Sequence, residues 1–121
     1  MSWTYSQSTG VLKHNGRVIY SNGYSGYGAA KNDPGMEALH DAGPIPRGRY
    51  TVEYATNSRR TGPHVLPLTP VGHNARGRSD FQIHGDSRRS PGNASHGCVI
   101  LPRAVRDTIS ASGDWVLEVV R

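Results

Sequence analysis

Short runs in which apolar and polar residues alternate predict a chain made mostly of β-strands. Asn15-Gly16 separates two of these runs and favours a two-residue type I′ turn, because both of its turn positions need a positive φ. This hairpin is the clearest local structure in the sequence, and the last run is expected to form a central strand. The runs lie at residues 3–5, 11–14, 17–20, 50–54, 65–68, 81–83, 99–101 and 115–120.

Proline and glycine positions limit the remaining elements. Pro67 lies in the run at 65–68 and has no N–H to donate, so this strand is expected at a sheet edge or a bulge. Pro102 is a favourable first residue for a helix that runs to about residue 111 and ends at Gly113. The predicted fold is therefore mainly β, a β-sandwich or partly open barrel with one short helix.

The segments between these runs are expected to be loops. The longest, residues 23–43, is rich in Gly, Asn and Pro and is expected to hold one helical turn near Met36. Loops of this length in small domains are more often functional than idle. Tyr24 and Tyr27 are candidates to line a substrate groove, with ordinary packing as an equal alternative. Polar loops are also expected at 57–63 and 71–80.

Composition and charge narrow the function classes. The 121 residues are expected to form one domain, 1–121, and 35% hydrophobic residues with 15 glycines and 8 prolines suit a loop-rich β protein. The net charge of +5 favours anionic partners. The arginines are scattered and no nucleic-acid motif accompanies them, so nucleic acid is not an expected partner. No apolar run is long enough for a membrane span. The protein is expected to be a monomer.

The N-terminus and the cysteine count bear on the compartment. Residues 1–5 lack the basic and apolar regions of a signal peptide, so synthesis in the cytoplasm without such a leader is expected. A single cysteine excludes an internal disulfide. Its thiol therefore stays free even in an oxidising periplasm, where a second cysteine would trap it.

The candidate chemistry lies between residues 81 and 101. Cys98 is the only cysteine, and a thiol with its ordinary pKa of about 8.5 needs a basic neighbour to act as a nucleophile near pH 7. His84, at the end of the predicted strand 81–83, carries a side chain that suits a general base at this pH. Gly97 lets the backbone turn so that N–H groups can face a developing negative charge. The hypothesis is an acyl-transfer site with Cys98 as nucleophile, His84 as base and an oxyanion pocket at the Gly97-Cys98 backbone.

Other interpretations of the same residues stay open. A lone cysteine is usually a small buried hydrophobe. Zinc ligation by His84, His96 and Cys98 with His64 or His73 uses suitable side chains, but the spacing matches no usual structural zinc pattern, so neither a metal nor a cofactor is expected. A papain-like site is disfavoured because no histidine follows Cys98 in the chain.

Several stretches together resemble a known family. Ile83-His84-Gly85 followed by Ser95-His96-Gly97-Cys98 resembles the signature of L,D-transpeptidase (YkuD-type) catalytic domains. The wider set of matches is most similar to the L,D-transpeptidase-like peptidoglycan effectors of type VI secretion systems. That set comprises Ser8-Thr9-Gly10, Tyr24-Ser25-Gly26, Lys31-Asn32, the run from Gly43 to Tyr50, Gly62-Pro63, Leu68-Thr69-Pro70 and Gly77-Arg78.

The resemblance implies an L,D-transpeptidase-like fold and a reaction on peptidoglycan. Cys98 would attack the carbonyl of the third residue of a tetrapeptide stem and release the terminal D-alanine. Water would then give L,D-carboxypeptidase activity, and an amine would give transpeptidation or D-amino acid exchange. The resemblance also implies an antibacterial effector that acts in the periplasm of a target bacterium, with a secretion apparatus and an immunity protein as partners. A non-enzymatic peptidoglycan-binding module and a housekeeping L,D-transpeptidase are the alternatives.

Further site residues are expected under this interpretation. The Gly85 carbonyl is expected to accept a hydrogen bond from the second ring nitrogen of His84. Asp86 is a rival partner for this nitrogen, and its alternative role is that of a loop or helix-capping carboxylate. His96 is expected to contribute through its backbone or by packing beside the cysteine, and Ser95 through a local hydrogen bond. The candidates to bind substrate, chiefly a stem carboxylate, are Arg78, Arg88, Arg89, Tyr24, Ser95 and Asp86.

One position departs from the wider family. Ile100 stands where those domains usually carry an arginine, two residues after the cysteine. Arg103 and Arg106 are the candidates to replace that charge. The departure argues against ordinary cross-linking activity more than against thiol chemistry.

Overall fold

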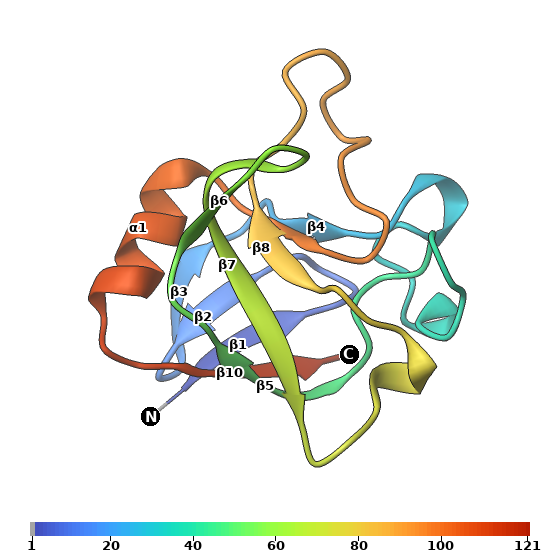
Figure 1. The fold of residues 1–121 in the computed structure, drawn as a ribbon. Coiled ribbons are helices and arrows are strands. Elements are labelled where there is room, and N and C mark those ends of the chain that lie inside the picture. The colour runs from blue at the N-terminus through green and yellow to red at the C-terminus, as the bar shows by residue number, and fades with distance from the viewer. Residues whose placement is uncertain (1) are drawn as a thin grey trace.

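The computed structural model describes residues 2–121 and has a ten-stranded sheet at its centre (Figure 1). Along the sheet the strand order is β3-β2-β1-β10-β5-β7-β8-β9-β4, and β6 pairs with β7 outside this path. The terminal strands β3 and β4 are not paired with each other, so the sheet stays open. The strands are β1 (Trp3–Ser6), β2 (Leu12–His14), β3 (Arg17–Tyr20), β4 (Tyr24–Ser25), β5 (Gly48–Val52), β6 (Thr56–Ser58), β7 (Gly62–Val71), β8 (Gln82–His84), β9 (Val99–Ile100) and β10 (Val116–Val120). The predicted mainly β, partly open fold with one short helix is confirmed.

The two ends of the chain form one half of the sheet. Strands β2 and β3 are the predicted hairpin, and Asn15 and Gly16 have φ values of 51° and 83°, as a type I′ turn requires. Strand β10 lies between β1, to which it is parallel, and β5, to which it is antiparallel. The prediction that the last strand is central is therefore confirmed.

The position of β7 corrects an expectation from the sequence. Residues 65–68 were expected at an edge or bulge because of Pro67, but they belong to a ten-residue strand between β5 and β8. The strand changes partner along its length: its first part pairs with β6, Leu66 and Pro67 pair with β8, and Leu68 to Val71 pair with β5. The prolines are tolerated because no single neighbour needs an N–H from every residue of the strand.

The segments expected to be loops contain short elements. Residues 57–63 are part of the β6–β7 hairpin, and the segment 23–43 begins with β4, which pairs with β9. The helical turn expected near Met36 is a 3₁₀ helix at Pro34–Met36, and two more 3₁₀ helices lie at Gly28–Ala30 and Ala75–Gly77. Two-residue strands and single turns are too short to produce a periodic pattern in the sequence.

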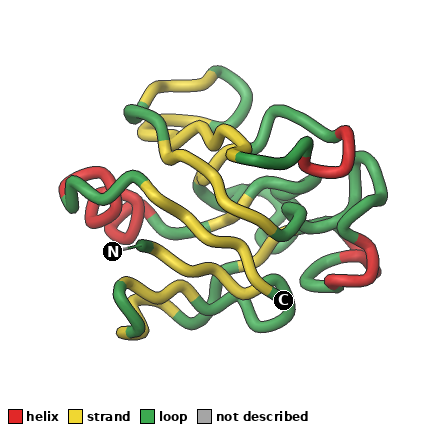
Figure 2. Tube along the Cα trace, turned by 90° about the horizontal axis from the view of Figure 1, so that it is seen from below, coloured by secondary structure: helices red, strands yellow, loops and turns green. Residues whose placement is uncertain are grey.

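The single α-helix, α1 (Arg103–Ala111), packs against β7 and β8 on the opposite side of the molecule from the 3₁₀ turns (Figures 1 and 2). Pro102 is its N-cap with φ −62°, and Gly113 with φ 72° follows its C-cap, so the predicted bounds hold within one residue. Ile109 joins the hydrophobic core with 1% exposure. Within residues 2–121 no helix is long and apolar enough to cross a membrane.

A buried carboxylate ties the long loop to the rest of the fold. Glu37 is 5% exposed and accepts hydrogen bonds from Gln7, from the backbone and side chain of Arg47, and from Arg76. Burial alone raises the pKa of a carboxyl, but these hydrogen bonds outweigh it and lower the pKa of Glu37 to about 2. The ionised form is thus the form that the fold stabilises.

Replacing Glu37 by Gln is expected to destabilise the protein by roughly 2 kcal/mol at pH 7, because Arg47 and Arg76 lose a charged acceptor. The pKa of Glu37 in the folded state lies below its ordinary value, so its contribution is present above that ordinary value and is lost as the pH falls toward 2. Urea unfolding of wild type and Glu37→Gln should therefore differ most at pH 7 and less at pH 3.

Glu118→Gln is the matched control, because Glu118 pairs with the exposed Arg49 at the surface. Its free energy of unfolding is expected to change by less than about 1 kcal/mol. Equal losses for the two variants would contradict the bracing role of Glu37.

Candidate active site

The parallel strands β8 and β9 place His84 and Cys98 on one face of the sheet. Ile83 pairs with Val99 and His84 with Ile100, so Cys98 lies two residues from the position opposite His84. Side chains alternate between the faces of a strand. Ile83 and Val99 point into the hydrophobic core, so His84 and Cys98 share the other face. The predicted strand ends are therefore side by side, as the sequence led us to expect.

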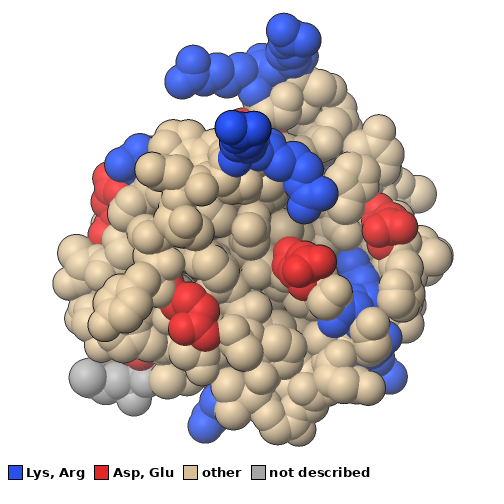
Figure 3. Space-filling model, in the orientation of Figure 1, with Lys and Arg blue, Asp and Glu red and all other residues tan. Residues whose placement is uncertain are grey.

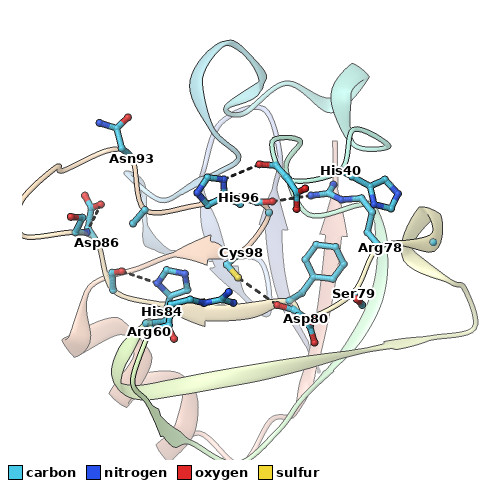
Figure 4. A pocket seen from close by; sticks show the side chains of 18 residues that line it. His40, Arg60, Arg78, Ser79, Asp80, His84, Asp86, Asn93, His96 and Cys98 are labelled. Atoms are coloured by element: carbon cyan, nitrogen blue, oxygen red, sulfur yellow. Dashed lines mark hydrogen bonds between the residues drawn. The ribbon is translucent and has the colours of Figure 1, made fainter.

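Both side chains line one open cavity of about 850 Å³ (Figure 4). Of the residues singled out in the sequence, Cys98, His84, Gly85, Asp86, His96, Gly97 and Arg78 line it. Ser95, Arg88 and Tyr24 do not. Within residues 2–121 no three His, Cys, Asp or Glu side chains come together as a metal site would require, so the zinc interpretation finds no ligand set there.

His84 is held in a defined orientation. Its Nδ1 lies 2.8 Å from the Gly85 carbonyl oxygen, the hydrogen bond expected for Gly85. A carbonyl only accepts, so Nδ1 carries the proton and Nε2 keeps its lone pair. Burial lowers the pKa of His84, the Gly85 hydrogen bond opposes this, and the charges of Arg106 and Arg60 lower the pKa further. The ring is therefore neutral at pH 7 and able to accept a proton at Nε2.

The Cys98 thiol is partly exposed and donates to the Asp80 carbonyl oxygen, with Sγ and O 3.7 Å apart. Burial raises the pKa of Cys98, and the Gln82 N–H and the charges of Arg60 and Arg78 offset only part of this rise. The resting group is therefore a neutral thiol. Among the described residues no hydrogen bond joins Sγ to His84, so the expected nucleophile–base contact is not made in this state.

Two buried serines hold the backbone beside the cysteine. Ser95 Oγ donates to the Cys98 carbonyl at 2.5 Å and accepts from the N–H groups of Gly26 and Gly97 at 2.8 and 3.1 Å. Ser25 Oγ donates to the Gly97 carbonyl at 3.0 Å and accepts from the Ile45 N–H at 2.8 Å. Ser95 thus makes the expected local hydrogen bonds behind the cavity wall. Ser25 was not among the site residues expected from the sequence, although it belongs to the matched stretch Tyr24-Ser25-Gly26.

Only glycine fits at position 97 in this arrangement. Its φ is 140°, and a Cβ would lie 2.5 Å from Nη2 of Arg78 and 3.1 Å from the Phe81 ring. Its N–H donates to Ser95 Oγ, so it does not face the cavity as an oxyanion donor. The Cys98 N–H makes no hydrogen bond within residues 2–121. Of the two donors expected at this backbone, the one left for a developing oxyanion is the Cys98 N–H.

Arg78 braces the loops around the cavity. Its guanidinium is buried, with Nη1 donating to the carbonyls of Glu37 and Pro44 at 2.6 and 2.8 Å, and Nη2 donating to those of Gly43 and His96 at 2.9 and 3.1 Å. These bonds occupy both terminal nitrogens, Nη1 and Nη2, with which the guanidinium would bind a substrate carboxylate. The structure therefore gives Arg78 a bracing position between the long loop and the segment before Cys98.

Asp86 and Tyr24 organise the loop between β8 and β9. Tyr24 donates to Asp86 Oδ1 at 2.5 Å and accepts from the Ala94 N–H at 3.0 Å, while Asp86 also accepts from the N–H groups of Ser87 and Gly92. The ring nitrogen for which Asp86 was a rival partner bonds to the Gly85 carbonyl instead. Asp86 is a loop carboxylate here, one of the two alternatives for this residue.

The remaining candidates lie at the margins of the site. His96 is exposed, its Nδ1 lies 2.8 Å from the Asp41 carbonyl, and its ring stacks on Tyr27 with centroids 4.9 Å apart. Its own carbonyl accepts from Arg78, while its ring packs on Tyr27 and not beside the cysteine, which was one of the two expectations for it. Arg88 and Arg89 are exposed in the β8–β9 loop outside the cavity lining.

The two arginines considered as replacements at Ile100 differ in position. Arg103 pairs with Asp107 on the exposed face of α1. Arg106 is 6% exposed and donates to three backbone carbonyls behind the site. Its charge reaches His84, whose pKa it lowers, but it does not line the cavity.

Ser95→Ala is expected to lower the free energy of unfolding by at least about 3 kcal/mol. The change leaves two buried N–H groups and one carbonyl without their partner, and each such group costs about 1–3 kcal/mol. Urea unfolding at pH 7 measures the loss. Ser90→Ala, in the exposed part of the same loop, is the control and should change stability by less than about 0.5 kcal/mol. A Ser95→Ala protein as stable as wild type would show that these three hydrogen bonds do not hold the backbone beside Cys98.

Comparisons with known proteins place the chain in a family. A family model described as the Tlde1 domain matches residues 20–113, whereas no curated protein matches the chain. Among solved structures, an L,D-transpeptidase from Stackebrandtia nassauensis is similar at 14% identity and a TM-score of 0.58, covering 99% of this chain and 55% of its own. L,D-transpeptidase 1 of Mycobacterium tuberculosis is similar at 18% identity and a TM-score of 0.52, and the match covers 99% of this chain and 60% of that protein. An L,D-transpeptidase from Xylanimonas cellulosilytica is similar at 18% identity and a TM-score of 0.56, and the match covers 98% of this chain and 59% of that protein.

At these identities the solved structures share the fold with this chain, which spans 55–60% of their length. The fold is thus of the L,D-transpeptidase type, and the resemblance noted in the sequence is confirmed. The family model covers most of the chain, from β3 to the end of α1. The chain therefore belongs to the Tlde1 domain family.

Proposed function

We propose that this domain is a cysteine-dependent acyl-transfer enzyme that acts on the tetrapeptide stems of peptidoglycan. The observation that carries the proposal is the shared open cavity in which Cys98 and an oriented, neutral His84 lie on one face of β8 and β9. The family and the L,D-transpeptidase fold support the choice of peptidoglycan as substrate. The activity is L,D-carboxypeptidase trimming, D-amino acid exchange or transpeptidation, according to the acyl acceptor.

The first step starts from the neutral pair. Rotation about χ1 of Cys98 turns Sγ from the Asp80 carbonyl toward His84, a movement between staggered side-chain positions. As Sγ attacks the scissile carbonyl carbon, its proton passes to Nε2 of His84. The Gly85 carbonyl stabilises the imidazolium that forms, because it accepts from Nδ1. The Cys98 N–H faces the negative charge that develops on the substrate oxygen.

The second step releases the products. His84 donates its proton to the leaving nitrogen as the C–N bond breaks, which leaves a thioester on Cys98 and a free amino acid. Water or an incoming amine then attacks the thioester, and His84 accepts the proton that it loses. When the C–S bond breaks, the Cys98 thiolate takes this proton back and the thiol is restored. Water gives a shortened stem, and an amine gives an exchanged or cross-linked one.

Cys98→Ser and His84→Ala are each expected to reduce D-alanine release from purified tetrapeptide muropeptides by at least about 100-fold, since the first loses the thiol nucleophile and the second the base. Mass spectrometry of the muropeptides measures the loss and separates trimming, exchange and cross-linking. Circular dichroism verifies that each variant is folded. Full turnover by either variant would exclude this mechanism and favour the non-enzymatic binding module.

We also propose that the domain serves as an antibacterial effector in the periplasm, a role supported by its family. Wild-type protein directed to the periplasm of a Gram-negative host is expected to cause rounding or lysis, because stem trimming weakens the wall. The same protein kept in the cytoplasm should be harmless, and Cys98→Ser should be harmless in both places. Toxicity that persists with Cys98→Ser would separate an effector role from the thiol chemistry.

A further inference from the structure

Arg60 lies at the turn between β6 and β7 and is anchored over the active-site strand β8. Ser58 Oγ accepts from the N–H groups of Arg60 and Thr61 at 3.2 and 3.1 Å, which closes the turn. Thr61 Oγ1 in turn donates to Gln82 Oε1 at 3.0 Å. Gln82 is the first residue of β8, and its backbone N–H lowers the pKa of the Cys98 thiol. The backbone of Arg60 is thus tied to β8, the strand that carries His84.

Arg60 and Arg78 are the two arginines that line the cavity. Both terminal nitrogens of Arg78 donate to backbone carbonyls, whereas the Arg60 guanidinium makes no ion pair or hydrogen bond within residues 2–121. Arg59, Arg88 and Arg89 are exposed and lie outside the cavity lining. Arg47, Arg49, Arg76 and Arg103 bind carboxylates, and Arg106 binds backbone carbonyls. Arg60 therefore brings the uncommitted guanidinium to the cavity.

The charge of Arg60 acts on both reacting side chains. It lowers the pKa of the Cys98 thiol and also that of the His84 imidazole. Figure 4 shows the Arg60 side chain beside His84 on the same side of the cavity as Cys98. Figure 3 shows basic side chains over the β6–β7 hairpin and the β8–β9 loop. The cavity itself is lined by both signs of charge, Arg60 and Arg78 together with Asp41, Asp80 and Asp86.

A guanidinium in this place fits a carboxylate close to the scissile bond. Its planar fork of N–H groups matches the two oxygens of a carboxylate. In a peptide, the α-carboxylate of the last residue lies one residue, about 3.8 Å of chain, beyond the carbonyl of the residue before it. A side chain that neighbours both Cys98 and His84 can reach that group while the thiol attacks the carbonyl.

We propose that Arg60 binds the terminal α-carboxylate of the residue that leaves, so that the enzyme selects stems ending one residue after the scissile bond. This inference rests on the acyl-transfer function proposed above. The contact persists through the reaction: the C–N bond breaks, the freed amine takes its proton from His84, and the amino acid departs with its carboxylate still ionised.

The same contact is available to one kind of acyl acceptor. A free amino acid that enters to attack the thioester carries an α-carboxylate for Arg60, as the leaving residue does. Recognition of a free carboxylate also disfavours longer stems, whose next peptide group is uncharged.

Two synthetic tetrapeptide stems test the proposal, one ending in D-alanine and the other in D-alaninamide. Wild type is expected to cleave the acid with a kcat/KM at least about 10-fold higher than the amide. Arg60→Ala should lower kcat/KM for the acid by at least about 10-fold more than kcat/KM for the amide, so that the preference disappears. Arg60→Lys should retain part of the preference, because an ammonium keeps the charge without the planar fork.

Arg59→Ala is the matched control, since Arg59 is exposed in the same turn but does not line the cavity. It should leave the preference for the acid as in wild type. The proposal is overturned if wild type cleaves acid and amide equally, or if Arg60→Ala lowers both rates by the same factor.

A binding measurement separates this inference from the proposed function. Cys98→Ala protein, which cannot turn over, is titrated with each tetrapeptide and followed by NMR. The acid should bind more tightly than the amide, and Arg60→Ala in the same background should remove the difference. If this difference is found while wild type cleaves neither peptide, the carboxylate site stands and the acyl-transfer function fails. Equal binding of acid and amide refutes the carboxylate site, whatever the activity.

Discussion

The active site depends on the hydrogen bonds that hold the backbone immediately before Cys98. Ser95 and Ser25 bond the peptide groups from Gly97 to Cys98 on one side, and Arg78 bonds the His96 carbonyl on the other. All three side chains are buried, so their bonds are little weakened by competition with water. The chain there can follow this path because Gly97 has no Cβ to meet Arg78. The position of the nucleophile therefore follows from polar contacts that reach it from other parts of the chain.

The open sheet gives these contacts a rigid base. Strand β9 is only two residues long, yet it lies between β8 and β4, so the segment after Cys98 is bonded on both sides. Strand β7 joins the β5 half of the sheet to the β8 half by changing partner along its length. The same strand also carries the hairpin turn that places Arg60 at the cavity. One long strand thus links the core of the fold to the rim of the site.

The electrostatic state of Cys98 and His84 follows mainly from their burial. Burial favours the uncharged forms of both Cys98 and His84, and Arg106 and Arg60 add to this for the imidazole. The resting pair is therefore neutral, and the proposed mechanism needs a proton transfer when the thiol attacks. A neutral thiol is also less prone to oxidation than a thiolate. The two arginines that line the cavity differ in their contacts. The Arg78 guanidinium bonds backbone carbonyls of the loops, whereas the Arg60 guanidinium has its N–H donors free.

The proposed reacting groups, Cys98 and His84, could be named from the sequence because the proposal depends on residue types and local patterns. A lone cysteine, a histidine at the end of an alternating run and a glycine before the cysteine were enough to indicate the pair. The Asn15-Gly16 hairpin and the helix after Pro102 were likewise predictable, because turn and helix signals act over a few residues. The central place of β10 was also expected and is observed.

Only the tertiary structure decided which polar groups face the cavity and which brace it. Pro67 suggested an edge, but β7 is central because its partners change along its length. The Gly97 N–H faces Ser95, Arg78 is occupied by four carbonyls, and Arg60 is free beside the nucleophile. These differences arise from contacts between residues far apart in the chain, such as Arg78 with Gly43 or Thr61 with Gln82. Local periodicity carries no information about such pairs. The sequence therefore indicates which residue types could react, and only the packing of distant segments decides which polar side chains face the cavity and which hold the backbone.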